Sequence, residues 1–370
     1  MKRPLALLSL AALALTACQP AGGSTIKIGF LGPLTGDIAA LGKDMLNGIT
    51  MAIDDVNAKG GVSGKKIELV TEDAKCTGAE AANGAQKLVN VDKVIAIIGG
   101  FCSGETLAAA PITEAGKVLL FSPGSSSPDV TKAGSFVFRN FPSDALKTIA
   151  MAKYFNESGY KTMAIITENT DYATAQRDAL LKNFGADKTV FNEAVEPGTK
   201  DYRSLITRLK SMDFDVFVPN GQSDSTNAAM IQQFREAGLT QPIVGTDTTD
   251  SQVVIDIAKD AAEGVHMVNV PTSGEGKTFE TDFTAKYGKP LSSIAWAAHS
   301  YDAAGVLIEA LKSGAVDGEA LRQYFDAMKE YTGVIGTFHF DENGDVVGIP
   351  FVLKTISGGK ISTVKPIPID

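Results

Sequence analysis

The sequence predicts an α/β protein built on parallel, doubly wound sheets, and three observations lead to this prediction. Short runs rich in isoleucine and valine recur along the chain, and amphipathic segments of helical length lie between them. The two patterns alternate at the spacing of βαβ units. In such sheets a ligand binds beyond the carboxyl ends of the strands, so the loops after the apolar runs are the candidate site.

The predicted strands are short apolar runs that turn residues flank. They are residues 26–31, 67–70, 94–98, 118–121, 162–166, 216–218 and 243–245. The predicted helices carry apolar residues at helical spacing between these runs. They are residues 45–57, 78–90, 144–156, 201–210 and 225–237.

The amino terminus has the layout of an export signal. Lys2 and Arg3 precede residues 5–15, which are almost wholly leucine and alanine. This run is too short to span a bilayer, and small residues follow it, as in a secretory signal peptide. We therefore expect the folded chain to lie outside the cytoplasm.

The end of this signal resembles the bacterial lipobox, because residues 15–18 read Leu-Thr-Ala-Cys. This resemblance implies cleavage before Cys18 and lipid attachment to it. We therefore predict a lipoprotein signal peptide over residues 1–17 and a flexible, lipidated tether over residues 18–24. The alternative is an ordinary cleaved signal in which the cysteine is coincidental.

The remaining cysteines and the histidines exclude some chemistry. Apart from Cys18, the chain has two cysteines, Cys76 and Cys102. In an oxidising compartment two cysteines are expected to pair, so we predict one disulfide between them. His266, His299 and His339 stand far apart, with no carboxylate or cysteine at ligand spacing. We therefore predict no metal site, no cofactor and no histidine-based catalysis.

Composition and charge set further bounds. The chain is 44% hydrophobic and has no low-complexity tract, which is typical of a globular protein large enough for two cores. The net charge is −9, and removal of Lys2 and Arg3 lowers it to −11. An acidic chain without lysine or arginine runs is not expected to bind nucleic acid. No other segment approaches the length of a transmembrane helix, so membrane contact is expected through the lipid anchor only.

Two loops after predicted strands are rich in hydrogen-bonding groups. Residues 99–104 read Gly-Gly-Phe-Cys-Ser-Gly and open a predicted helix near Glu105. The free N–H groups of a helix start, together with the Ser103 hydroxyl, form a site for a small anion. Residues 122–128 read Ser-Pro-Gly-Ser-Ser-Ser-Pro, a sequence that its prolines keep from being helical. Either loop alone is also compatible with a simple turn.

Several motifs occur in one order along the chain. They are Asn-Ala-Lys-Gly-Gly-Val-Ser-Gly at 57–64, Asp-Ala-Lys-Cys at 73–76, Phe-Cys-Ser at 101–103, the 122–128 loop, Asp-Tyr at 171–172 and Ala-Gly-Leu at 237–239. Together they resemble the leucine/isoleucine/valine-binding protein family, the type I periplasmic solute receptors of ATP-driven amino-acid importers. The resemblance extends from about Thr25 to the carboxyl terminus.

This resemblance implies two doubly wound α/β lobes that three hinge crossings join, with an amino acid bound in the cleft. The expected bounds are 25–140 plus 272–337 for lobe one, 144–270 plus 341–366 for lobe two, and 141–143, 271 and 338–340 for the crossings.

The resemblance also implies a set of ligand-binding residues. Ser103 and the amides around it are expected to hold the α-carboxylate, while Ser126 bridges to the ammonium and Gly124 offers its carbonyl. Tyr172 is expected to come from lobe two on closure. Asp247 stands where the family usually places a glutamate that pairs with the ammonium. One buried carboxylate would then balance the amine of the zwitterion.

Some expectations keep an alternative. Asp247 is also compatible with a helix N-cap for the segment near Ser251. Phe101 is expected beside the ligand, but Gln222 stands where many of these receptors have a tyrosine, and Leu41 where an aromatic usually caps the pocket. Both departures concern the side-chain end of the ligand. A branched-chain, other small aliphatic or partly polar amino acid is therefore compatible with the sequence.

The favoured function is a monomeric, lipid-anchored binding protein that delivers an amino acid to the membrane permease of an ABC importer. A ligand sensor of the same fold and a binder of a small amide or carboxylic acid are the alternatives. An exported hydrolase would need Ser103 or Ser126 as its nucleophile, yet neither lies in a Gly-x-Ser-x-Gly elbow. We therefore predict no catalytic residue and no enzymatic activity.

Overall fold

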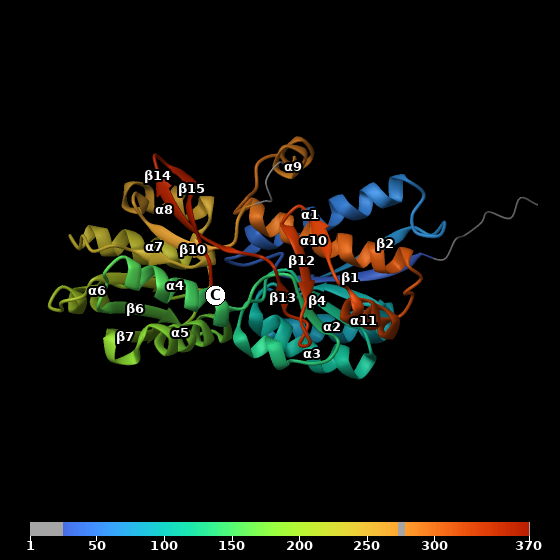
Figure 1. The fold of residues 1–370 in the computed structure, drawn as a ribbon, viewed down its shortest axis with the longest axis horizontal. Coiled ribbons are helices and arrows are strands. Elements are labelled where there is room, and N and C mark those ends of the chain that lie inside the picture. The colour runs from blue at the N-terminus through green and yellow to red at the C-terminus, as the bar shows by residue number, and fades with distance from the viewer. Residues whose placement is uncertain (1–24, 273–277, 370) are drawn as a thin grey trace, which may run out of the picture.

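The computed structural model describes residues 25–272 and 278–369. The predicted signal peptide, the tether and Cys18 lie outside the described residues. The chain forms two lobes side by side, with the blue, cyan and orange segments in one lobe and the green, yellow and dark red segments in the other (Figure 1). This arrangement is the predicted pair of doubly wound lobes.

Lobe one contains a five-stranded parallel sheet in the order β2-β1-β3-β4-β5. Its strands are β1 (Ile26–Gly32), β2 (Ile67–Asp73), β3 (Ala96–Gly99), β4 (Leu119–Ser122) and β5 (Val137–Arg139). Its helices are α1 (Ala39–Ala58), α2 (Gly78–Lys87), α3 (Ser103–Gly116), α9 (Phe279–Tyr287), α10 (Ile294–Lys312) and α11 (Gly318–Ala327). The strand order reverses between β1 and β3, where doubly wound sheets place ligands.

Lobe two repeats this order. A parallel β7-β6-β8 sheet continues through a bridge between Phe217 and Ile243 to β9 and β10, and β14 and β15 add an antiparallel edge. The strands are β6 (Met163–Glu168), β7 (Thr189–Val195), β8 (Val216–Asn220), β9 (Val244–Gly245), β10 (His266–Asn269), β14 (Phe351–Ser357) and β15 (Lys360–Ile367). The helices are α4 (Asp144–Glu157), α5 (Asp171–Phe184), α6 (Arg203–Leu209), α7 (Asp224–Glu236) and α8 (Gln252–Ala258), with a 3₁₀ turn, η4, at Asp247–Thr249.

The seven predicted strands and the five predicted helices are each present, which confirms the alternating pattern. Helix α10 was not predicted, because it is apolar on most of its surface and carries no amphipathic signal. It packs closely on α1 at Gly48, where a Cβ atom would lie 2.2 Å from the carbonyl oxygen of Ala297. No helix in the described part of the chain is long and apolar enough to cross a bilayer.

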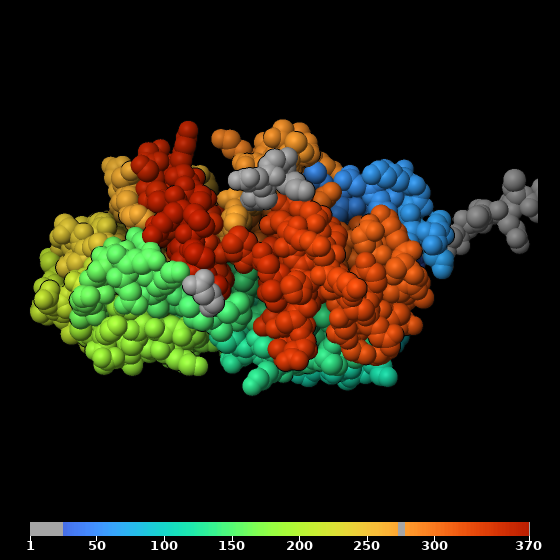
Figure 2. Space-filling model, viewed as in Figure 1, coloured from blue at the N-terminus to red at the C-terminus, as the bar shows by residue number. Residues whose placement is uncertain are grey.

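A small sheet near the carboxyl terminus packs on lobe one. It consists of β11 (Tyr331–Gly333), β12 (Gly336–Phe340) and β13 (Val346–Val347). Phe340 contacts the rings of Phe121 and Phe138, and Arg139 pairs with Asp345 at 2.7 Å. Beyond this sheet the chain enters β14 and β15, whose atoms are dark red and lie over the other lobe (Figure 2). We therefore propose that the third crossing follows β13, later than the expected residues 338–340.

Candidate functional site

A small cavity of about 20 Å³ lies between the lobes, at the carboxyl ends of the strands. Its lining residues are Phe101, Cys102, Ser103 and Gly124 from lobe one, and Tyr172, Gln222, Asp247 and Thr248 from lobe two. Six residues that the sequence analysis selected are therefore brought together around one space. A larger groove near Val91 and Val316 lies at the amino end of β1, where doubly wound sheets do not bind ligands.

The lobe one side of the cavity is the start of α3. Gly99 and Gly100 have φ values of 157° and 67°, which turn the chain sharply between β3 and α3. The Ser103 hydroxyl accepts a hydrogen bond from the Ser127 N–H at 3.1 Å. No described residue accepts a hydrogen bond from the N–H of Ser103 or Gly104. This helix start therefore offers backbone donors and the positive end of the helix dipole to an anion.

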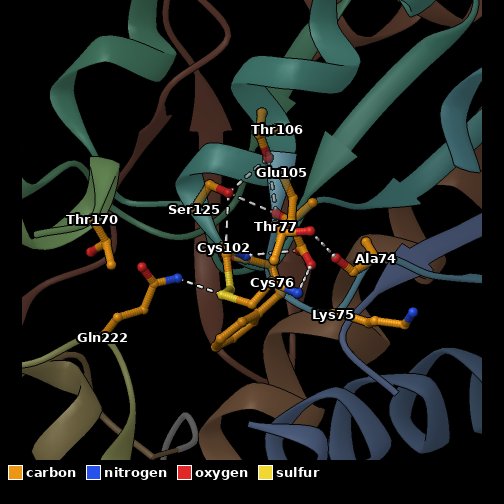
Figure 3. Close-up of a disulfide and its surroundings, with 12 residues drawn as sticks. Ala74, Lys75, Cys76, Thr77, Cys102, Glu105, Thr106, Ser125, Thr170 and Gln222 are labelled. Atoms are coloured by element: carbon orange, nitrogen blue, oxygen red, sulfur yellow. Dashed lines mark hydrogen bonds between the residues drawn. A yellow bond between two sulfur atoms is a disulfide. The ribbon is translucent and has the colours of Figure 1, made fainter. Parts of the chain in front are cut away.

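The predicted disulfide between Cys76 and Cys102 is confirmed, with 5.4 Å between the two Cα atoms. Beneath it, Glu105 accepts hydrogen bonds from the N–H of Cys76 at 2.7 Å and of Cys102 at 3.1 Å. Gln222 reaches across from lobe two and donates its amide N–H to the Cys76 sulfur (Figure 3). The disulfide is thus part of the cavity wall and a contact between the lobes.

The lobe two side of the cavity is charged. Asp247 Oδ1 accepts a hydrogen bond from the Tyr172 hydroxyl at 2.8 Å and another from the Lys147 ammonium. Lys147 Nζ also lies 2.6 Å from Asp144 Oδ1. All four side chains are buried. The sequence analysis missed Lys147 and Asp144, which lie in the first turn of α4, where charged residues are usually exposed.

Two residues of the predicted set do not line the cavity. Ser126 lies behind it and donates a hydrogen bond from its hydroxyl to Asp144 Oδ2 at 3.0 Å. Leu41 is buried in the core of lobe one. On the lobe one side, the aromatic side chain that lines the cavity is Phe101, which packs edge-on against Trp296 with 4.9 Å between the ring centroids. The sequence analysis did not select Trp296.

The alternative role of Asp247 as a helix cap is wrong. Ser251 caps α8, because its hydroxyl accepts a hydrogen bond from the Val253 N–H at 3.1 Å. The Asp247 carboxylate bonds to Lys147 and Tyr172 instead. Asp247 therefore belongs to the charged side of the cavity.

Burial and neighbouring charges shift the pKa values of Lys147, Asp144 and Tyr172, which form one cluster with Asp247. Burial opposes the ammonium form of Lys147, but the charges of Asp144 and Asp247 outweigh it and raise the pKa of the lysine. Burial raises the pKa of Asp144, which Lys147 partly opposes. Burial, with the charge of Asp247, also raises the pKa of Tyr172, so the phenol is neutral at physiological pH. The cluster therefore holds one permanent cation between two carboxyl groups.

The described residues hold no group of three histidine, cysteine or acidic side chains suited to a metal ion. His299 is fully buried, and its Nδ1 lies 3.0 Å from the carbonyl oxygen of Asn140. Burial lowers the pKa of His299 to about 3. This histidine is a neutral part of the core.

Comparison with known proteins places the chain in a family. A family model described as periplasmic binding protein matches residues 25–360. The chain is also 30% identical over 352 residues to the Leu/Ile/Val-binding protein of Escherichia coli K12, which covers 92% of this chain and 93% of that protein. The chain belongs to the Leu/Ile/Val-binding protein family.

Solved structures of this family share the fold. A leucine-binding protein from Thermotoga maritima superimposes with a TM-score of 0.86 at 29% identity, over 93% of this chain and 99% of that one. A branched-chain amino acid transporter substrate-binding protein from Streptococcus pneumoniae, solved with isoleucine, has a TM-score of 0.84 at 29% identity, over 93% of this chain and 100% of that one. These Leu/Ile/Val-binding relatives are extracytoplasmic solute-binding proteins of transporters and not enzymes.

Proposed function

We propose that this chain captures an α-amino acid between its lobes and delivers it to the membrane permease of an ABC importer. One observation carries the proposal: the cavity combines the start of α3, a site for a carboxylate, with Asp247, a site for an ammonium group. The two groups come from different lobes, so only a closed cleft satisfies both ends of a zwitterion. Closure on a ligand is how such a receptor signals occupancy to its permease.

The remaining lining residues limit the ligand side chain. Phe101 and Cys102 offer apolar surface, while Gln222 and Thr248 offer hydrogen-bonding groups. These features favour a branched-chain, other small aliphatic or partly polar amino acid.

A small carboxylic acid or amide is the second candidate, and Lys147 is the observation that favours it. Because Lys147 already bonds to Asp247, it supplies a cation to the residue expected to pair with the ligand ammonium. A carboxylic acid would still bind at the start of α3. The charge on the ligand therefore decides between the two functions.

Replacing Asp247 tests the proposal. A micromolar complex has a binding free energy of about −8 kcal/mol. Loss of one partner of a buried charge pair costs roughly 2 to 5 kcal/mol. We therefore expect Asp247→Asn to weaken amino-acid binding at least 30-fold in calorimetry, after a thermal-shift screen of the twenty amino acids has identified the ligand.

The control is Asp187→Asn, which changes an exposed carboxylate on the same lobe and should leave binding unchanged. An Asp247→Asn chain that binds the amino acid within a few-fold of the wild type would contradict the amino-acid function. A ligand without an amino group in the screen would favour the second candidate.

We further propose that a lipid on Cys18 anchors the mature protein to the cell envelope. The Leu-Thr-Ala-Cys sequence at residues 15–18 supports this proposal. Mass spectrometry of the mature protein should find a chain that begins at Cys18 and carries lipid. An unmodified chain with any other first residue would contradict the anchor.

A further inference from the structure

We propose that Asp144, Lys147 and Asp247 act as one charged unit that selects ligands with a single ammonium group, and that Lys147 is the residue that sets this charge. The unit contains two carboxylates and one ammonium, so it lacks one positive charge. The ammonium of an α-amino acid supplies that charge. The inference rests on the proposed binding function and adds the residues that determine which ligand charge fits.

Lys147 lies between the two carboxylates. Its Nζ lies 2.6 Å from Asp144 Oδ1 and also bonds to Asp247 Oδ1. The lysine side chain is fully buried, and Asp144 and Asp247 are almost completely so. An ammonium so placed is attracted to both carboxylates. It neutralises one of the two negative charges and leaves the other.

The hydrogen bonds show where the remaining charge is exposed to a ligand. Both oxygens of Asp144 have partners, since Lys147 and Gln176 bond to Oδ1 and Ser126 bonds to Oδ2. Asp247 accepts both of its side-chain hydrogen bonds at Oδ1. No described residue donates to its Oδ2. Asp247 is also the member of the unit that lines the cavity, so this oxygen is the one available to a ligand ammonium.

No second protein cation balances the unit among the described residues. The groups that face Lys147 come from α4, α5 and η4, and they are Asp144, Tyr172 and Asp247. Tyr172 is neutral and donates its hydroxyl to Asp247. Gln176, also on α5, is uncharged and bonds to Asp144 and Tyr172. A ligand that closes the cleft without an ammonium group would therefore bury an unbalanced carboxylate unless a proton binds with it.

This charge count predicts different proton linkage for two ligands of one carbon skeleton. L-Leucine should bind to the wild type with no change in affinity between pH 6 and pH 8 and with no proton exchange. 4-Methylpentanoate, which lacks the amino group, should bind at least 30-fold more weakly at pH 8 and take up one proton. Calorimetry at one pH in buffers of different ionisation enthalpy counts these protons without any variant, and L-alanine with propanoate provides a second matched pair.

Three variants test Lys147 and Asp144 directly. Lys147→Met leaves two unbalanced carboxylates, so the affinity for L-leucine should fall and should then rise up to tenfold for each unit that the pH decreases. Asp144→Asn leaves one cation and one anion, so the preference for L-leucine over 4-methylpentanoate should fall at least tenfold. The double variant Lys147→Met with Asp144→Asn again leaves one carboxylate. It should regain affinity for L-leucine within a few-fold of the wild type, together with a flat pH profile.

The double variant separates the charge of Lys147 from its structural role. If Lys147 were needed only for packing, removing the Asp144 carboxylate as well would not restore the binding that Lys147→Met loses. A Lys147→Met chain that binds L-leucine as the wild type does at every pH would overturn the inference. So would a double variant that binds no better than Lys147→Met, or a wild type that takes up no proton with 4-methylpentanoate. A wild type that binds neither amino acid would overturn the proposed amino-acid function first, and this inference with it.

Discussion

Glu105 is the buried residue that holds the two cysteines of the disulfide in place. Lys75 and Cys76 have φ values of 49° and 59°, a left-handed conformation that costs roughly 1 to 2 kcal/mol for each non-glycine residue. The Glu105 carboxyl accepts hydrogen bonds from the N–H of Cys76 and of Cys102. Cys102 directly precedes Ser103, the first residue of α3. Burial raises the pKa of Glu105 to about 8, although these hydrogen bonds oppose the shift.

Glu105 should therefore make stability depend on pH. The folded chain holds a proton on this group that the unfolded chain has lost above the ordinary glutamate pKa of 4.5, so the free energy of unfolding falls as the pH rises from 4.5 through about 8. Between pH 7 and pH 8 we expect a loss of about 1 kcal/mol. Urea unfolding at several pH values measures this slope, which Glu105→Gln should reduce. Glu80→Gln, an exposed change near the same turn, is the control and should leave the slope unchanged.

At the scale of elements, the local spacing of apolar residues predicted the helices and strands that form from local sequence alone. Seven strands and five helices of the two lobes were predicted because each carries its own periodicity, whereas β5, β7, β10 and α5 were not predicted. Strands β14 and β15 gave no such signal, since their place at the edge of lobe two depends on pairing with β10, far away in the sequence. The proposed later position of the third crossing also depends on contacts between distant residues, because Phe340 of β12 packs on Phe121 and Phe138 of lobe one.

The same distinction explains the candidate site. Ser103 was selected because it opens a helix after a predicted strand, and the family resemblance assigned it, Gly124 and Tyr172 to the ligand. Lys147 was missed, because an aspartate and a lysine three residues apart in a first helical turn are typical of an exposed surface. Its burial depends on contact with Asp247, which is 100 residues away in the sequence.

At the scale of the whole molecule, polar contacts outside the cavity also join the two lobes. Lys200 of lobe two pairs with Asp37 of lobe one at 2.9 Å, but both side chains are more than 60% exposed. Such exposed pairs contribute about 0 to 1 kcal/mol. Ser292 of lobe one makes buried contacts with lobe two, because its hydroxyl donates to Asp224 at 3.1 Å and lies 3.0 Å from the Ser251 hydroxyl, and its carbonyl oxygen accepts the Gln252 N–H at 3.0 Å. A ligand that binds to both lobes would add to these polar contacts.

The cavity that both lobes line predicts that ligand binding closes the molecule. The start of α3 and Asp247 each satisfy one end of an amino acid, so the ligand supplies the missing attraction between the lobes. Small-angle scattering should show a smaller radius of gyration with saturating amino acid than without it. Asp247→Asn should not become compact at the same ligand concentration, because its lobe two offers no carboxylate to the ammonium. Asp187→Asn should close as the wild type does. Wild-type profiles that superimpose with and without ligand would mean that the lobes are rigidly docked, and the cavity would then admit its ligand without hinge motion.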